Sequence, residues 1–120
     1  MVLIFTGNEQ IDKDLSKVIH DSRVVYYPDY VLQEEEAKIL IIAVQNNKFD
    51  FKDFIFKVRK RDIRIILLLE DDKQPELEYA LKLGIYDIIF DPFEIRDIQN
   101  KITKPTPFSE ISKYIWKIIE

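Results

Sequence analysis

Short apolar runs alternate along the whole chain with segments in which apolar residues recur at helical spacing. The runs cover residues 2–5, 23–27, 39–44, 63–69 and 85–90, and polar or turn residues follow each of them. Short runs rich in β-branched and aromatic side chains are typical of strands. The unbroken apolar character of residues 39–44 is expected when helices cover both faces of a parallel sheet.

Between these runs, the apolar residues repeat every three or four positions. This spacing predicts amphipathic helices around residues 11–19, 51–58, 77–81 and 95–102, with a shorter helix over 32–37. Pro75 suits the first turn of its helix, and Gly84 suits the position after the last turn. Five successive β–α units predict a doubly wound α/β fold with one open parallel sheet and helices on both faces.

The C-terminal residues form a separate unit in this pattern. Residues 104–107 (Lys-Pro-Thr-Pro) break the fifth helix, and Ser109 is predicted to cap a final helix. We therefore expect a domain over residues 1–103, then a linker and C-terminal helix over 104–120. The final helix has an apolar stripe wider than a free tail should expose, so it should pack on this domain, on a second copy or on a following domain. The stripe contains Ile111, Ile115, Ile118 and Ile119, with Trp116 beside it.

Composition narrows the possible classes of function. The chain has 120 residues, no cysteine and a net charge of −4, and no apolar run approaches the roughly 20 residues of a membrane helix. With no signal peptide at its start, we expect a cytoplasmic protein without disulfides or thiolate metal sites. The one basic cluster lies at the end of a predicted helix, where cations favour the helix dipole, so nucleic-acid binding is not expected. It consists of Lys57, Arg59, Lys60 and Arg61.

Candidate chemistry is confined to the carboxyl ends of the predicted strands, where ligands bind in such folds. These ends carry Gly7-Asn8-Glu9, Pro28-Asp29, Gln45-Asn46, Glu70-Asp71-Asp72 and Asp91. With only two glycines, the chain cannot form a glycine-rich nucleotide loop, and the single histidine, His20, is interpreted as structural. We expect no cofactor and no enzymatic activity. The alternative is a flavodoxin-like domain that binds Mg²⁺, Ca²⁺ or a small ligand at Glu70, Asp71 and Asp72, with Asp91 nearby.

Residues 84–93, Gly-Ile-Tyr-Asp-Ile-Ile-Phe-Asp-Pro-Phe, resemble the end of response-regulator receiver domains. The matching positions are Gly84, Asp87, Pro92 and Phe93. The resemblance extends over residues 1–103 in the order of elements and implies a flavodoxin-like sheet with strand order 2-1-3-4-5. It also implies a cis Asp91–Pro92 bond, which is uncommon for X–Pro bonds in general.

The same resemblance predicts that the phosphorylation chemistry of receivers is lost. The acidic pair that holds Mg²⁺ aligns near Thr6 and Gly7, and the phospho-acceptor position falls on or near Ala43. The switch hydroxyl position falls near Leu69, and Asp91 replaces the lysine that pairs with the phosphoryl group. A carboxylate at that position would repel a phosphoryl group. The chain therefore resembles a degenerate receiver, or pseudo-receiver.

A degenerate receiver with this tail is also similar to the atypical receiver domains that precede MinD-like ATPases in bacterial pilus-assembly proteins of the TadZ type. That similarity implies localisation or self-association, through a protein partner that is a second copy or a following ATPase domain. Receivers commonly associate through the face made by the fourth helix, fifth strand and fifth helix, and the tail would extend this face. The interface residues predicted on it are Glu76, Tyr79, Lys82, Tyr86, Phe93 and Trp116.

Overall fold

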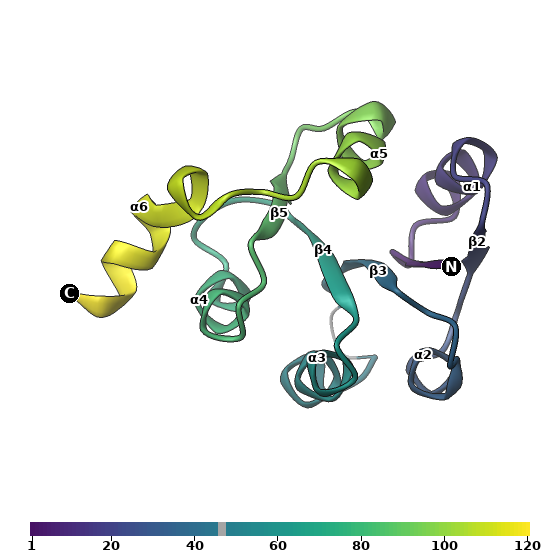
Figure 1. Cartoon of the computed structure of the whole chain (residues 1–120), viewed down its shortest axis with the longest axis horizontal. Helices are drawn as coiled ribbons and strands as arrows, with labels where there is room; N and C mark the ends of the chain where they lie inside the picture. Colours follow the sequence, from purple (N-terminus) through teal and green to yellow (C-terminus); the bar gives the residue numbers. More distant parts are fainter. Residues whose placement is uncertain (46–47) are drawn as a thin grey trace.

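A central parallel sheet lies between two layers of helices in the computed structural model, which describes residues 1–45 and 48–120 (Figure 1). The strand order is β2-β1-β3-β4-β5, as predicted. The strands are β1 (Val2–Phe5), β2 (Ser22–Val24), β3 (Ile39–Ala43), β4 (Arg64–Leu69) and β5 (Asp87–Phe90). The helices are α1 (Glu9–Val18), α2 (Pro28–Gln33), α3 (Phe51–Lys60), α4 (Pro75–Lys82), α5 (Ile95–Thr103) and α6 (Phe108–Ile119).

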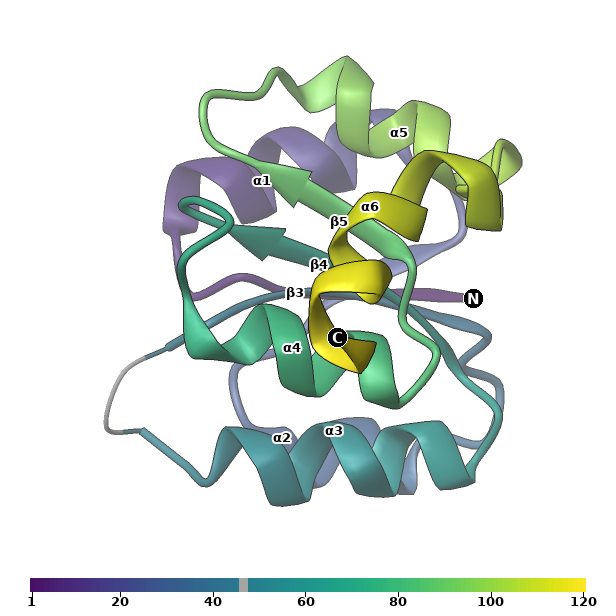
Figure 2. The ribbon, with the colours of Figure 1, turned by 90° about the vertical axis from the view of Figure 1, so that its left-hand side faces the viewer.

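Helices cover both faces of the sheet, and this arrangement explains the unbroken apolar runs. Helices α1 and α5 lie on one face, and α2, α3 and α4 lie on the other (Figures 1 and 2). Successive residues of a strand point to opposite faces, so Leu3 and Phe5 join one apolar cluster while Val2 and Ile4 join the other. Both faces of the strands are therefore buried, as the apolar run at 39–44 predicted.

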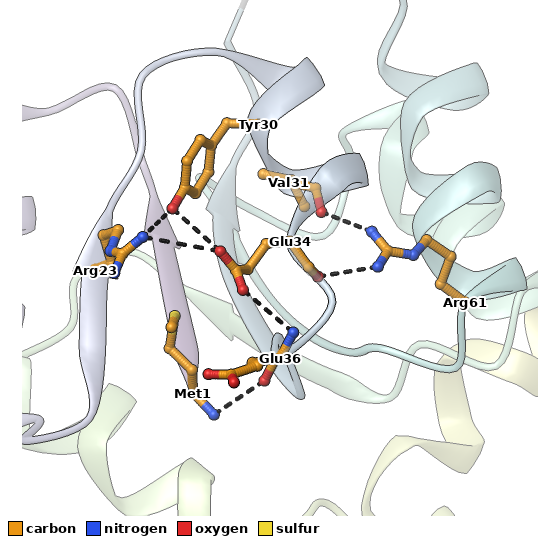
Figure 3. Close-up of polar contacts among 7 residues, drawn as sticks. All are labelled: Met1, Arg23, Tyr30, Val31, Glu34, Glu36 and Arg61. Atoms are coloured by element: carbon orange, nitrogen blue, oxygen red, sulfur yellow. Dashed lines mark hydrogen bonds and ion pairs between the residues drawn. The ribbon is translucent and has the colours of Figure 1, made fainter.

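Helix α2 lies earlier in the chain than predicted. It spans Pro28–Gln33 rather than residues 32–37, because Pro28 occupies the first helical turn, where its missing N–H costs no hydrogen bond. The guanidinium of Arg61, at the end of α3, donates to the carbonyl oxygens of Val31 and Glu34, both at 2.9 Å (Figure 3). This fork satisfies carbonyls at the C-terminal end of α2 and fixes where the helix ends.

Two backbone predictions from the end of the receiver-like segment are confirmed. Gly84 has φ +76° just after α4, and the Asp91–Pro92 peptide bond is cis. The predicted cap of the final helix is wrong: α6 begins at Phe108 with Pro107 at the N-cap position, which places Ser109 inside the first turn. Pro107 has extended backbone angles and its carbonyl accepts from the Glu110 N–H at 3.1 Å, so the helical bonding begins earlier than expected.

A buried polar contact holds the linker after α5 against the sheet. The carboxylate of Asp87, on β5, accepts from the Arg64 guanidinium on β4 and from the Thr106 backbone N–H, both at 2.7 Å. Arg64 also donates to the carbonyls of Lys101 and Ile102 at the end of α5. One ion pair therefore fixes the end of α5 and the course of the linker into α6.

Helix α6 packs along the β5 edge of the sheet (Figures 1 and 2). Ile111 is fully covered by the domain, and Ile115 and Ile118 pack partly against the same apolar cluster. Tyr114 lies against Phe90 of β5, with ring centroids 5.7 Å apart. The tail therefore packs on its own domain, but by one side only. No helix within the described residues is long and apolar enough to cross a lipid bilayer.

Candidate functional site

Four of the five positions that align with receiver chemistry converge at the carboxyl ends of the strands. Thr6, Ala43, Leu69 and Asp91 line one cavity of about 190 Å³ between the ends of β1, β3 and β4. The fifth position, Gly7, does not line this cavity but a neighbouring one. The fold thus brings together the residues that the sequence alignment selected, although they lie far apart in the chain.

The side chains in this first cavity do not suit a phosphoryl group. Ala43 and Leu69 contribute only apolar atoms, and the charged residues among the described lining are the carboxylates Glu70 and Asp91. An anion placed there would face like charge with no lysine or arginine to neutralise it. The described lining of this cavity therefore offers apolar atoms and carboxylates but no cation.

The acidic run after β4 is not assembled into a metal site. The Glu70 N–H is bonded to the Gln74 side chain, and Asp71 accepts from the Lys73 N–H at 2.8 Å, which makes a local turn. Across residues 1–45 and 48–120, no three His, Cys, Asp or Glu side chains are grouped to hold a metal ion. Glu70, Asp71, Asp72 and Asp91 are all exposed. Asn46, which follows Gln45 at the predicted end of the third strand, lies outside the described residues.

A buried carboxylate next to this cavity was missed in the sequence. Asp12 of α1 is 5% exposed and accepts two hydrogen bonds at Oδ1: from the Thr6 hydroxyl at 2.5 Å and from the Thr6 backbone N–H at 3.2 Å. Burial raises the pKa of the Asp12 carboxyl, and the bonds from Thr6 offset part of this rise. Asp12 shares one side of the helix with Leu15 and Ile19, but this spacing alone does not distinguish a buried carboxylate from an exposed one.

A second and larger cavity, of about 390 Å³, lies at the carboxyl ends of β1, β2 and β3. Asp12 lines it together with two consecutive tyrosines, Tyr26 and Tyr27, which are each 73% exposed. These tyrosines follow β2, whose predicted extent to residue 27 was too long, because the strand ends at Val24. The remaining lining residues are Phe5, Gly7, Glu9, Val25, Gln45 and Lys48.

The basic cluster at the end of α3 has structural partners, as its position suggested. Arg59 donates to the carbonyls of Leu83 and Ile63, and Arg61 caps α2. Lys57 forms an ion pair with Asp53 one turn away, at 2.8 Å. His20 is exposed and lies just beyond the end of α1 rather than inside it.

The predicted interface residues do not form one open surface. On α4, Leu77, Ala80 and Leu81 face the core as predicted, and Lys82 is exposed. Tyr79, however, is half-buried and its hydroxyl donates to the Lys52 carbonyl on α3 at 3.0 Å, so it does not point outward.

The other members of that predicted interface also differ in exposure. Glu76 is half-buried, with a covered Oε2. Tyr86 packs edge-on against Phe108 of α6, and Phe93 packs partly on the α1–α5 side of the core. Helix α6 therefore lies on part of the face that it was expected to extend, and of the predicted set Lys82 and Trp116 remain exposed.

The outer side of α6 carries the exposed apolar side chains of this region. Phe108, Trp116 and Ile119 are all more than half exposed, and they surround a shallow groove with Ser112 and Ile115. Trp116 therefore lies outside the domain's core, whereas Ile111 is part of it. The helix has two apolar sides, one used by the domain and one facing solvent.

Comparison with solved structures places the fold among receiver domains. The chain is similar to the BeF₃-activated receiver domain of DrrB, with 14% identity, a TM-score of 0.71, and coverage of 86% of this chain and 93% of that one. It is also similar to a response regulator of Clostridium difficile, with 14% identity, a TM-score of 0.70, and coverage of 85% of this chain and 91% of that one. A third similar structure is the chemotaxis protein CheY4 of Vibrio cholerae, with 15% identity, a TM-score of 0.69, and coverage of 88% of this chain and 97% of that one. No family model and no curated protein matches the sequence. These likenesses confirm the predicted flavodoxin-like fold of the receiver type.

Proposed function

We propose that this protein is a pseudo-receiver, a receiver fold that binds a protein partner without being phosphorylated and without catalysing a reaction. The observation that supports this most directly is the first cavity, where the receiver positions meet. Ala43 offers no nucleophile, Leu69 no hydroxyl and Asp91 no cation, and the charged groups present would repel a phosphoryl group. The fold is retained while each chemical part is replaced.

The binding surface is the outer side of α6, and the partner is a second copy of the chain. Phe108, Ser112, Ile115 and Ile119 are spaced by four, three and four residues, the spacing of a seam between two helices, with Trp116 beside them. A two-fold dimer uses the same patch on both subunits. Aromatic anchors such as Phe108 and Trp116 are typical of such patches.

The charges along this patch also suit an antiparallel pairing. Lys113 and Glu120 lie seven residues apart, on the same flank of the exposed stripe. A two-fold partner that runs in the opposite direction brings the Glu120 end of one helix toward Lys113 of the other, twice per dimer. By the similarity to TadZ-type proteins, such self-association would serve localisation, beside an ATPase domain.

Self-association is tested by sedimentation over a range of protein concentrations. The wild-type protein should form a dimer, and Trp116→Ser should shift it toward the monomer. The matched control is Phe56→Ser, which changes an exposed aromatic on a different helix, α3, and should leave the dimer intact. A wild type that stays monomeric at high concentration would refute the second copy as partner and leave a different protein or domain as the occupant.

Loss of phosphorylation is tested separately by intact mass after incubation with a small phosphodonor and Mg²⁺. The mass should stay unchanged. A stable addition of one phosphoryl group would overturn the pseudo-receiver assignment even if the dimer forms.

A further inference from the structure

The second cavity has the features of a ligand site, and neither the receiver chemistry nor the α6 surface uses it. It lies at the carboxyl ends of β1, β2 and β3, where the chain passes from one side of β1 to the other. In open parallel sheets this reversal of strand order opens a crevice in which ligands bind. Its volume, about 390 Å³, lies within the range of small-molecule pockets.

The walls of this cavity are held in place by contacts on the protein side. The Gln45 amide donates to the Phe5 carbonyl at 3.2 Å, and its side chain closes over Gly7. A Cβ at Gly7 would lie 2.8 Å from Gln45, and its φ of +73° also favours glycine. Phe49 stacks on Phe5, with centroids 5.5 Å apart, and anchors the segment that carries Lys48. The shape is therefore largely formed before a ligand arrives.

The charged side chains that line the cavity are two carboxylates and one lysine. Both hydrogen bonds that Asp12 receives from Thr6 go to Oδ1, which leaves Oδ2 for a ligand. Glu9 adds a second carboxylate, and Lys48 is the one cation among the described lining residues. Two carboxylates against one lysine disfavour a phosphorylated ligand, whereas a neutral molecule with N–H donors and one acceptor fits the set.

The tyrosines supply the apolar part of the site. Tyr26 and Tyr27 are exposed, yet both line the cavity. Large, solvent-exposed aromatic rings beside a polar cavity can serve as a stacking platform, because a planar ligand can stack on them without rearrangement of the protein core. Stacking selects flat ligands, and the carboxylates select flat ligands that carry N–H groups.

We propose that the cavity between the ends of β1, β2 and β3 binds a neutral, planar nitrogen heterocycle of the purine type, stacked on the tyrosine pair and donating N–H bonds to Asp12. Guanosine is the best-matched probe, because its ring N–H can donate to Oδ2 of Asp12 and its carbonyl oxygen can face Lys48. Adenosine keeps the flat ring but has an acceptor nitrogen in place of this ring N–H.

The test is a titration followed by ¹H–¹⁵N NMR of the full chain. Guanosine at about 1 mM should shift the signals of residues 5–9, 25–27 and 48, and adenosine should bind more weakly. The corresponding monophosphate should bind more weakly than guanosine, because it brings an anion toward Glu9 and Asp12. Tyr27→Ala or Tyr26→Ala should weaken guanosine binding by about fivefold or more, as expected when a base loses a stacking partner.

Two further variants separate the site from general effects on the fold. Asp12→Asn can still accept from Thr6 at Oδ1, so it should stay folded and lose the preference for guanosine over adenosine. Phe56→Ser changes an exposed aromatic of α3 that does not line this cavity, so it should leave guanosine binding unchanged. Absence of shifts at these residues, tighter binding of the monophosphate, or binding of an arginine amide in place of the nucleosides would each overturn the proposal.

Discussion

Removal of the Asp87 carboxylate should destabilise the protein more than any change to the exposed acidic residues around the receiver-like site. Asp87 is 6% exposed and holds the Arg64 guanidinium and the Thr106 N–H, both at 2.7 Å. Asp87→Ala leaves a mostly covered guanidinium without its counter-ion and a backbone N–H without its acceptor. Breaking a buried pair from one side costs about 3–5 kcal/mol, and we expect about 3 kcal/mol because Arg64 is a quarter exposed and keeps its bonds to α5.

Asp87→Asn separates the charge from the hydrogen bonds. The amide oxygen can still accept from Thr106, so the loss should be about 1.5 kcal/mol, the lower end of the scale for one hydrogen bond to a charged group. Asp91→Asn is the matched control, since Asp91 is exposed and such surface changes stay within about 0.5 kcal/mol. Urea unfolding measures all three, and in a melting experiment 3 kcal/mol corresponds to about 12 °C for a domain of this size.

Limited proteolysis adds a local measurement to the same variants. If Asp87 fixes the linker, cleavage within residues 104–107 should become faster in Asp87→Ala than in Asp91→Asn, even where both are folded. A loss in Asp87→Ala no larger than in Asp91→Asn would refute the reasoning, and so would equal losses in the alanine and asparagine variants.

Three other changes test separate parts of the structure. Burial raises the pKa of Asp12 in the folded state, so the folded protein binds the proton more tightly and its stability falls as pH rises through this pKa. Asp12→Asn should therefore gain stability relative to wild type between pH 3 and pH 7, measured by urea unfolding. A relative loss of stability over that range would contradict the assignment. Asp62 has φ +59°, so Asp62→Gly should stabilise by about 1 kcal/mol in thermal unfolding, and a clear loss would show that its side chain matters more than its backbone. Arg61→Met should cost about 1–3 kcal/mol in the same assay, because two carbonyls at the end of α2 lose their donor, whereas Lys60→Met, a change to its exposed neighbour, should be near neutral.

Much of the fold could be predicted because local patterns and the tertiary structure agree. Residues 39–43 of β3 and 65–69 of β4 are apolar throughout, as expected for a sheet covered on both faces. The errors lie where two local signals compete. Pro28 was interpreted as the end of a strand, but it begins α2, since proline suits both positions and the Arg61 fork from α3 decides between them.

The candidate site was predicted in part, for a similar reason. The resemblance to receivers selected Asp91, Ala43, Leu69 and Thr6 at the strand ends, and these residues share a cavity. Asp12 was missed because a charged residue in an amphipathic helix is normally counted on its solvent side. Its burial depends on the Thr6 hydroxyl and N–H at the end of β1, which no spacing within α1 reveals.

The sequence by itself determined the α/β class, the order of elements and the glycine after α4, because each depends on residue type at a known distance along the chain. The tertiary structure alone decided which side of α6 is covered and where the tyrosines of the second cavity lie. Helix α6 has apolar residues on two sides, and only its packing against Phe90 and the core selects Ile111 for burial and leaves Trp116 in solvent. Periodicity shows that a helix has an apolar side, but a partner far away in the chain determines which side is used.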